Sequence, residues 1–222
     1  MFHAAFESTP AREVQIRRLV IAGWTGRDSV ALEKHVRELE ALGVKPPATT
    51  PIFYEVAAAR ATTASTIDAS GSKSSGEVEF VLLRLDGETW VGVGSDHTDR
   101  EVETYGVTVS KQMCDKPVAP VFWPFASVEK HWDKLMLRAH IYEANGSRVL
   151  YQEGSVGHML APAELLSKWG RPLEEGMLMM GGTLAAKGGI RPSRRFEVEL
   201  EDPVLGRRIV HGYDINELPV RG

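Results

Sequence analysis

The chain has 222 residues and little that would support a disulfide framework, a membrane span or a nucleic-acid interface. Its one cysteine, Cys114, cannot form an internal disulfide and is more typical of a small buried filler than of a nucleophile. No Cys/His spacing matches a zinc site, and no apolar run is long enough to cross a bilayer. A formal net charge of -4 gives no indication of the basic surface that binds nucleic acid. We therefore expect neither a membrane nor a nucleic-acid partner.

The N-terminus also lacks the basic-then-apolar order of a signal peptide, since Glu7, Arg12 and Glu13 interrupt it. We expect a cytoplasmic protein. Internal repeats and heptads are absent, and 43% hydrophobic with 25% charged residues is ordinary for a globular chain. The length allows a single domain.

The feature that stands out is an acidic hairpin over residues 76–100. Apolar and β-branched residues crowd two arms on either side of Asp86-Gly87, a strong turn signal. Period two puts Glu77 and Glu79 on one face of the first strand, and Asp96 lies just past the end of the second. Three such carboxylates repel one another unless a cation neutralises them. Oxygen ligands of this kind suit a hard divalent ion, Mg²⁺ or Mn²⁺.

The rest of the chain predicts many strands and few, short helices in mixed order. The clearest helix begins after Asp28 and ends near Gly43, and it carries His35 and Glu38 three residues apart on one face. By itself this pair indicates a solvated helix face. The functional alternative is a histidine base whose tautomer is fixed by the acid. Other elements are expected as strands at 13–23, 51–56, around 64–67 and at 196–200, a hairpin of 137–141 with 148–152, and helices at 127–135, capped by Ser127, and from 161.

Several short motifs follow one another along the chain. They are a His-x-x-Glu pair, a strand with Pro and Phe, a Glu-x-Glu strand and an Asp followed by Arg, represented here by His35 and Glu38, Pro51 and Phe53, Glu77 and Glu79, and Asp96 and Arg100. Further on, Lys111 precedes a proline-rich segment, with Lys116 as the competing choice. Gly182-Thr183 then forms a late glycine motif. Taken in this order, these motifs resemble those of the fumarylacetoacetate hydrolase superfamily.

The resemblance implies an α/β (α+β), strand-rich fold, a mixed β-sandwich or β-roll of the fumarylacetoacetate hydrolase type. It implies one domain over 1–222, with a lid or N-terminal segment at 1–50 and a metal-binding core at 51–222. In that reading His35, Glu38 and Lys111 are catalytic, Arg100, Gly182 and Thr183 bind substrate, and the metal ligands are Glu77, Glu79 and Asp96. It also implies a homodimer.

The implied activity is a metal-dependent hydrolase or lyase that cleaves a C–C bond in a small oxo (diketo) acid through a metal-stabilised enolate. A decarboxylase or tautomerase on the same site, and a non-catalytic small-molecule binding protein, are the alternatives. The chain departs from the usual motifs at three places: Ser95 replaces the usual asparagine, Tyr54 stands where relatives often have lysine, and the residues after Thr183 lack the usual proline. His97 and Asp99 are second-rank candidates, and the basic cluster of Arg191, Arg194 and Arg195 has no assigned role. The sequence strings at 94–100 and 188–193 look like those of a divergent bacterial branch of the superfamily.

Overall fold

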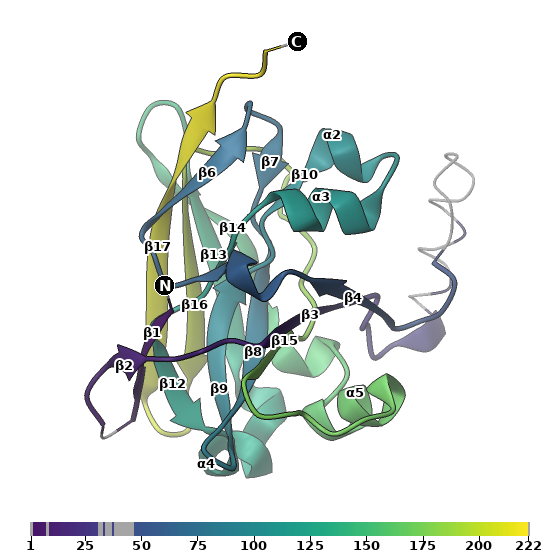
Figure 1. The fold of residues 1–222 in the computed structure, drawn as a ribbon, viewed down its shortest axis with the longest axis vertical. Helices are drawn as coiled ribbons and strands as arrows, with labels where there is room; N and C mark the ends of the chain where they lie inside the picture. Colours follow the sequence, from purple (N-terminus) through teal and green to yellow (C-terminus); the bar gives the residue numbers. More distant parts are fainter. Residues whose placement is uncertain (1, 8, 31–32, 34–36, 38–46, 222) are drawn as a thin grey trace.

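The computed structural model describes residues 2–7, 9–30, 33, 37 and 47–221. An eight-stranded and a five-stranded sheet form its main body, and short helices lie at two ends (Figure 1). This architecture confirms the predicted strand-rich class. Within the described residues, no helix is both long and apolar enough to cross a membrane.

The eight-stranded sheet has the spatial order β2-β1-β12-β9-β8-β15-β3-β4. Its strands are β1 (His3–Phe6), β2 (Arg12–Glu13), β3 (Arg18–Gly23), β4 (Ile52–Val56), β8 (Val78–Leu85), β9 (Glu88–Ser95), β12 (Val121–Pro124) and β15 (Met177–Met180). The five-stranded sheet has the order β14-β13-β16-β17-β6, and its strands are β6 (Thr66–Ser70), β13 (Met136–Tyr142), β14 (Arg148–Ser155), β16 (Arg195–Asp202) and β17 (Arg207–Leu218). Two small ladders pair β5 (Ala61–Thr62) with β11 (Lys116–Pro117) and β7 (Ser74–Ser75) with β10 (Thr98–Asp99).

Short helices lie at opposite ends of these sheets. In Figure 1, α2 and α3 lie at the end that carries β7, while α4 and α5 lie at the other end. The α-helices are α2 (Arg100–Glu103), α3 (Val107–Met113), α4 (Phe125–Val128) and α5 (Pro162–Trp169), and the 3-10 helices are η1 (Ala58–Arg60), η2 (Glu129–Lys134) and η3 (Val156–His158).

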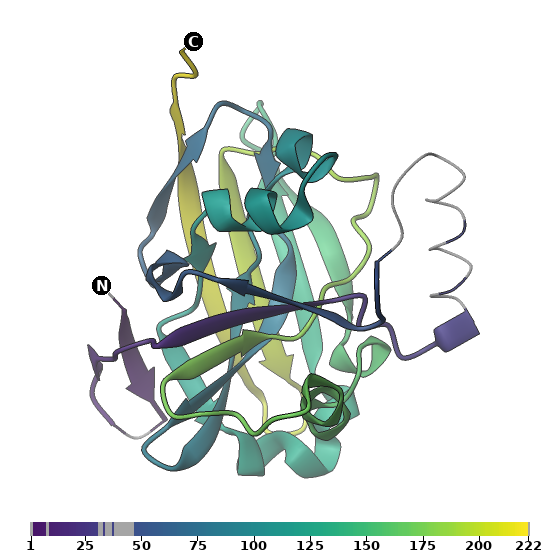
Figure 2. The same ribbon diagram turned by 45° about the vertical axis from the view of Figure 1, so that its right-hand side comes forward.

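The core lies on both faces of the eight-stranded sheet. On one face, Phe80 and Leu82 of β8 belong to the same apolar cluster as Val198 and Leu200 of β16. On the other face, alternate residues of β8 join a second cluster that includes β1 and β12. All six residues from 78 to 83 are therefore buried, which explains the apolar run from Phe80 to Leu83 and leaves Glu79 as a buried acid. Figure 2 shows β3 running across the direction of β16 and β17.

The turn of the central hairpin confirms the Asp-Gly signal. Asp86 and Gly87 both have positive φ, +55° and +74°, as a two-residue type I′ turn requires. The register that follows aligns Val78 with Ser95. The residues just beyond this pair, Glu77 and Asp96, are thereby brought side by side.

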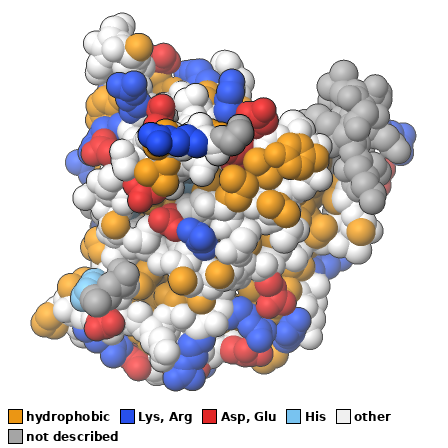
Figure 3. Space-filling model, turned by 45° about the horizontal axis from the view of Figure 1, so that its top comes forward, with side chains coloured by type: hydrophobic (Ala, Val, Ile, Leu, Met, Phe, Trp, Pro, Cys, Tyr) orange, Lys and Arg blue, Asp and Glu red, His pale blue; other side chains and the backbone are white. Residues whose placement is uncertain are grey.

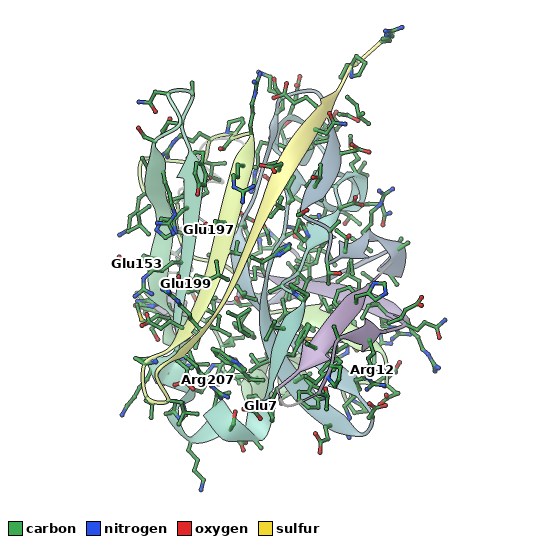
Figure 4. All side chains as sticks on the ribbon, turned by 90° about the vertical axis from the view of Figure 1, so that its left-hand side faces the viewer. Glu7, Arg12, Glu153, Glu197, Glu199 and Arg207 are labelled. Atoms are coloured by element: carbon green, nitrogen blue, oxygen red, sulfur yellow. The ribbon has the colours of Figure 1, made fainter. Side chains whose placement is uncertain are left out.

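Charged side chains cover the outward face of the five-stranded sheet, where Figure 4 labels Glu153, Glu197 and Glu199. Arg138 lies 2.8 Å from Glu199 and 3.1 Å from Glu153, which offsets their mutual repulsion. Figure 4 also labels Glu7, which lies 2.7 Å from Arg207 of β17. The outward face of this sheet therefore carries a network of ion pairs.

A different surface is apolar. On the face that carries α2 and α3, hydrophobic side chains gather in Figure 3. Tyr105, Val109 and Met113, at the end of α2 and on α3, are exposed there. Nothing in this arrangement tests the predicted homodimer, which stays a prediction.

Two predicted elements need correction. The single strand expected at 13–23 is interrupted, and its two ends belong to β2 and β3. These strands have different partners, because β2 pairs with β1 whereas β3 pairs with β15. The helix expected at 127–135 begins at Phe125, and Ser127 lies inside it, where its hydroxyl donates to the Pro124 carbonyl at 2.7 Å. Ser127 is therefore not the N-cap.

Candidate metal centre

The three predicted acids meet at the open end of the β8–β9 hairpin. One carboxylate oxygen from each of Glu77, Glu79 and Asp96 lies within 4.8 Å of the others. The hairpin register explains this: the Asp96 N–H donates to the Glu77 carbonyl at 2.9 Å, which extends the ladder by one pair. Glu77 and Glu79 share a strand face because side chains alternate along β8.

Glu79 is the acid whose ionised form the surroundings disfavour most. Its side chain is buried, and burial together with the nearby Asp96 charge raises the pKa of Glu79 well above its ordinary value. The backbone N–H of Gly182 donates to its carboxylate at 2.6 Å and works against this shift. The negative charge of ionised Glu79 is thus poorly compensated by the chain itself.

Asp96 has the opposite environment, because two lysine ammonium groups contact it. Lys111 Nζ donates to one carboxylate oxygen, and Lys116 Nζ lies 3.1 Å from the other. Burial opposes ionisation of Asp96, but the charges of Lys111 and Lys116 outweigh it and hold its pKa well below the usual range. Burial lowers the pKa of Lys116, whereas Asp96 and Glu77 overcome burial and raise that of Lys111.

The two lysines differ in access. Lys116 is completely buried, and its ammonium also donates to the His97 carbonyl, so it holds Asp96 from behind. Lys111 comes from α3, and its ammonium lies 4.0 Å from Glu77 and over the ring of Tyr54, 5.6 Å from the centroid. Lys111 thus lies on the side of Glu77 and Tyr54, whereas Lys116 is an internal counter-charge, and the catalytic role of Lys111 stays a prediction.

Arg100 closes the rim of the site. Its guanidinium lies 3.3 Å from Glu77 and 2.9 Å from Glu103, and its Nε donates to Ser75 Oγ at 2.6 Å. These three contacts fix the guanidinium beside the most exposed of the three acids. Arg100 therefore lies next to the three acids, and its substrate-binding role stays a prediction.

Gly182 and Thr183 also lie against the hairpin, through contacts with β8. The Thr183 hydroxyl donates to the Val78 carbonyl at 2.8 Å, and Gln152 of β14 donates to Thr183 Oγ1 at 2.9 Å. The same Gln152 accepts the Val78 N–H at 2.9 Å. Gln152 thus ties the five-stranded sheet to the start of β8, and no local motif marks it in the sequence.

Replacement of Gly182 by alanine is expected to destabilise the protein strongly. Gly182 has φ +103°, and an added Cβ would lie 1.8 Å from the hydroxyl oxygen of Thr25. Backbone strain and overpacking together predict a loss of about 2–4 kcal/mol in the free energy of unfolding. Gly189→Ala is the matched control, because Gly189 has φ +84° with open space around it. Urea unfolding of both variants measures the difference, and equal losses would refute the packing argument.

His97 and Asp99 are buried but serve other contacts. The His97 imidazole bonds Tyr213 and Ser74, and burial, reinforced by the Lys116 charge, lowers its pKa to about 3. Asp99 is the N-cap of α2 and accepts the N–H groups of two helix residues. Cys114 is buried, as expected of a filler.

Other predicted residues lie elsewhere. Two arginines of the basic cluster pair with surface acids, since Arg191 lies 3.4 Å from Glu143 and Arg195 lies 2.9 Å from Asp214. His35 and Glu38 fall outside the described residues, and so does most of the predicted helix that would carry them.

Comparison with solved structures shows the fold. Yeast ynq8, a fumarylacetoacetate hydrolase family protein, is 19% identical with a TM-score of 0.65, over 92% of this chain and 95% of that one. A 2-keto-3-deoxy-D-arabinonate dehydratase in its apo form is 15% identical with a TM-score of 0.62, over 95% and 76%. Cg1458 is 13% identical with a TM-score of 0.65, over 92% and 77%. The chain thus has the fumarylacetoacetate hydrolase fold, as its motifs predicted.

Comparison with known sequences identifies the family of the chain. No curated protein matches the chain. The family model described as a protein of unknown function (DUF2848) matches residues 22–213, most of the chain. The chain therefore belongs to the DUF2848 family.

Proposed function

We propose that this protein is a divalent-metal-dependent enzyme that cleaves a C–C bond in a small oxo acid. One observation carries the proposal: three carboxylates converge within 4.8 Å at the mouth of a hairpin, beside Lys111 and Arg100. The likeness in fold to a fumarylacetoacetate hydrolase family protein supports it. The substrate class comes from the sequence resemblance.

The donor set fits a hard divalent cation. Carboxylate oxygens bind Mg²⁺ or Mn²⁺, and an ion with ligand distances of about 2.0–2.6 Å spans oxygens up to about 5 Å apart. Burial and, after it, the charge of nearby Asp96 raise the pKa of Glu79, and a cation would offset both effects by favouring the ionised carboxylate. Glu77, Glu79 and Asp96 would hold the ion, which would supply positive charge to two oxygens of a chelating oxo acid.

The charges of the site favour an anionic substrate only once the ion is present. Ionised Glu77, Glu79, Asp96 and Glu103 outnumber the cationic side chains of Arg100, Lys111 and Lys116 by one. A divalent ion converts this deficit into an excess of one positive charge. The site would then attract a carboxylate, with Lys111 and Arg100 as the groups closest to it.

In the proposed reaction His35, oriented by Glu38, takes a proton from water, and the hydroxide adds to the carbonyl carbon of the substrate. The C–C bond breaks, its electron pair remains on the oxo-acid fragment as an enolate, and a proton then returns to carbon. Lys111 stabilises the negative charge on oxygen during this step. Decarboxylation and tautomerisation pass through the same kind of enolate, so they are alternative outcomes of one assay.

Replacement of Lys111 by methionine is expected to separate turnover from metal binding. The loss of one cation near the acids should leave Mn²⁺ affinity unchanged or tighter, whereas kcat/KM should fall about 10²–10³-fold with the loss of an oxyanion partner. The assay measures cleavage of acylpyruvates and decarboxylation of oxaloacetate with Mg²⁺, with Mn²⁺ and with a chelator. Absence of turnover on every oxo acid, in a wild type that binds Mn²⁺, would favour the non-catalytic alternative.

A further inference from the structure

A chain of buried hydrogen bonds runs behind the acids and has no part in the function proposed above. The Tyr213 hydroxyl of β17 donates to Ser95 Oγ at 2.7 Å, and His97 Nδ1 lies 3.1 Å from the Tyr213 oxygen. His97 Nε2 lies 2.8 Å from Ser74 Oγ. All four residues are buried. We call Tyr213, Ser95, His97 and Ser74 the buried relay.

The donors of the relay can be ordered. The single proton of the Tyr213 hydroxyl points to Ser95, so the Tyr213 oxygen accepts from His97, which must carry its proton on Nδ1. Nε2 of the neutral imidazole is then an acceptor, and the Ser74 hydroxyl donates to it. Each of these three interactions then has one donor and one acceptor.

The relay contacts the backbone that carries two of the acids. Ser95 Oγ accepts the Glu77 N–H at 3.2 Å, and Ser95 and His97 are the two sequence neighbours of Asp96. The His97 carbonyl accepts from Lys116, whose ammonium lies 3.1 Å from Asp96. A shift of the relay would therefore move Glu77 and Asp96 relative to each other.

Gly76 shows how closely the relay is packed at this point. A Cβ added to Gly76 would lie 2.5 Å from the Tyr213 hydroxyl and 2.6 Å from Ser95 Oγ. Only glycine leaves room for the relay directly before Glu77. Glycine is therefore required at position 76, where the buried relay lies next to Glu77.

We propose that Tyr213, Ser95 and His97 are positioning residues that fix Glu77 and Asp96 in the arrangement that binds a divalent cation. This inference rests on the metal site of the proposed function. Groups that orient ligands without touching the ion commonly change metal affinity about 10–100-fold when removed. The constraint comes from the five-stranded sheet, because Tyr213 belongs to β17 whereas Glu77 and Asp96 flank the open end of the β8–β9 hairpin.

Tyr213→Phe tests this with the removal of one oxygen atom. Its matched control is Tyr151→Phe, because Tyr151 is also buried and packs edge-on against the same Phe196. Among the described residues, the hydroxyl of Tyr151 bonds the Arg191 N–H at 3.3 Å and none of the three acids. Mn²⁺ titration followed by electron paramagnetic resonance gives both the affinity and the symmetry of the bound ion. We expect Tyr213→Phe to weaken Mn²⁺ binding about 10–100-fold and to alter the spectrum, and Tyr151→Phe to leave both as in wild type.

A second variant separates positioning from general destabilisation. Ser95→Ala should weaken Mn²⁺ binding as well, and the double variant with Tyr213→Phe should bind no more weakly than Ser95→Ala alone, since both act through one oxygen. If wild type binds Mn²⁺ and the two tyrosine variants bind equally well or lose affinity equally, the positioning role is wrong and the metal site stands. If wild type binds no Mn²⁺, the proposed function and this inference both fail.

Discussion

Asp96→Asn is expected to abolish divalent-metal binding and to lower the free energy of unfolding by about 3–5 kcal/mol. The substitution keeps the shape of the side chain but removes the charge that Lys111 and Lys116 share. Lys116 is completely buried, so its ammonium would be left without a neutralising partner. Calorimetric titration with Mn²⁺ and urea unfolding in a chelator measure the two effects.

Asp202→Asn is the matched control for this experiment. Asp202 is also completely buried and pairs with His131 at 2.9 Å and Arg207 at 3.3 Å, far along the chain from the acids. Its replacement should cost stability but leave Mn²⁺ affinity unchanged. Undiminished Mn²⁺ binding by Asp96→Asn would remove Asp96 from the ligand set.

Glu79→Gln is expected to weaken metal binding about 100-fold or more while the metal-free protein becomes no less stable. Burial and the Asp96 charge raise the pKa of Glu79, so its ionised form opposes folding. The glutamine carbonyl can still accept the Gly182 N–H that bonds Glu79. This variant therefore separates the metal-binding role of the carboxylate from its structural role.

The sign of the pH dependence follows from the direction of that shift. Because the folded state binds the Glu79 proton more tightly than the unfolded chain, this residue lowers stability as the pH rises above the ordinary carboxyl value of 4.5. In a chelator, the stability of Glu79→Gln relative to wild type should increase between about pH 5 and about pH 8. Urea unfolding at both pH values measures it, and a constant difference would contradict the raised pKa. Glu199→Gln, on the outward face of the other sheet, controls for the loss of a carboxylate.

Local sequence was sufficient for the hairpin and its acids. The Asp86-Gly87 turn fixes the register, and alternation along β8 then determines which side chains share a face. Convergence of Glu77, Glu79 and Asp96 follows from these two facts alone. Lys111 and Lys116 could be proposed only as alternatives, because which one faces outward depends on the packing of α3 and β11 against the hairpin.

Contacts that join distant segments could not be read from the sequence. Tyr213 lies 118 residues from Ser95, and Gln152 lies 74 residues from Val78, so no periodicity or spacing marks either pair. Gly182 and Thr183 were identified by motif as substrate-binding groups, whereas their N–H and hydroxyl bond Glu79 and the Val78 carbonyl. A substrate role for these two groups stays a prediction. The pair His35 and Glu38 likewise stays a prediction, because it lies outside the described residues.

The departure at Ser95 has a physical account. A serine hydroxyl is short enough to accept both the Tyr213 O–H and the Glu77 N–H, at 2.7 and 3.2 Å. These two oxygens also fill the space beside Gly76, where an added Cβ would lie 2.5 Å from the Tyr213 hydroxyl and 2.6 Å from Ser95 Oγ. Ser95 and Tyr213 are therefore best understood as a matched pair.

A crystal structure grown with Mn²⁺ and oxalate, measured near the manganese absorption edge, would test the central claim most directly. The account predicts one anomalous peak within about 2.0–2.6 Å of oxygens from Glu77, Glu79 and Asp96, with oxalate on the side of Lys111 and Arg100. An anomalous map without a peak between these acids, with Lys111 still bonded to Asp96, would contradict it.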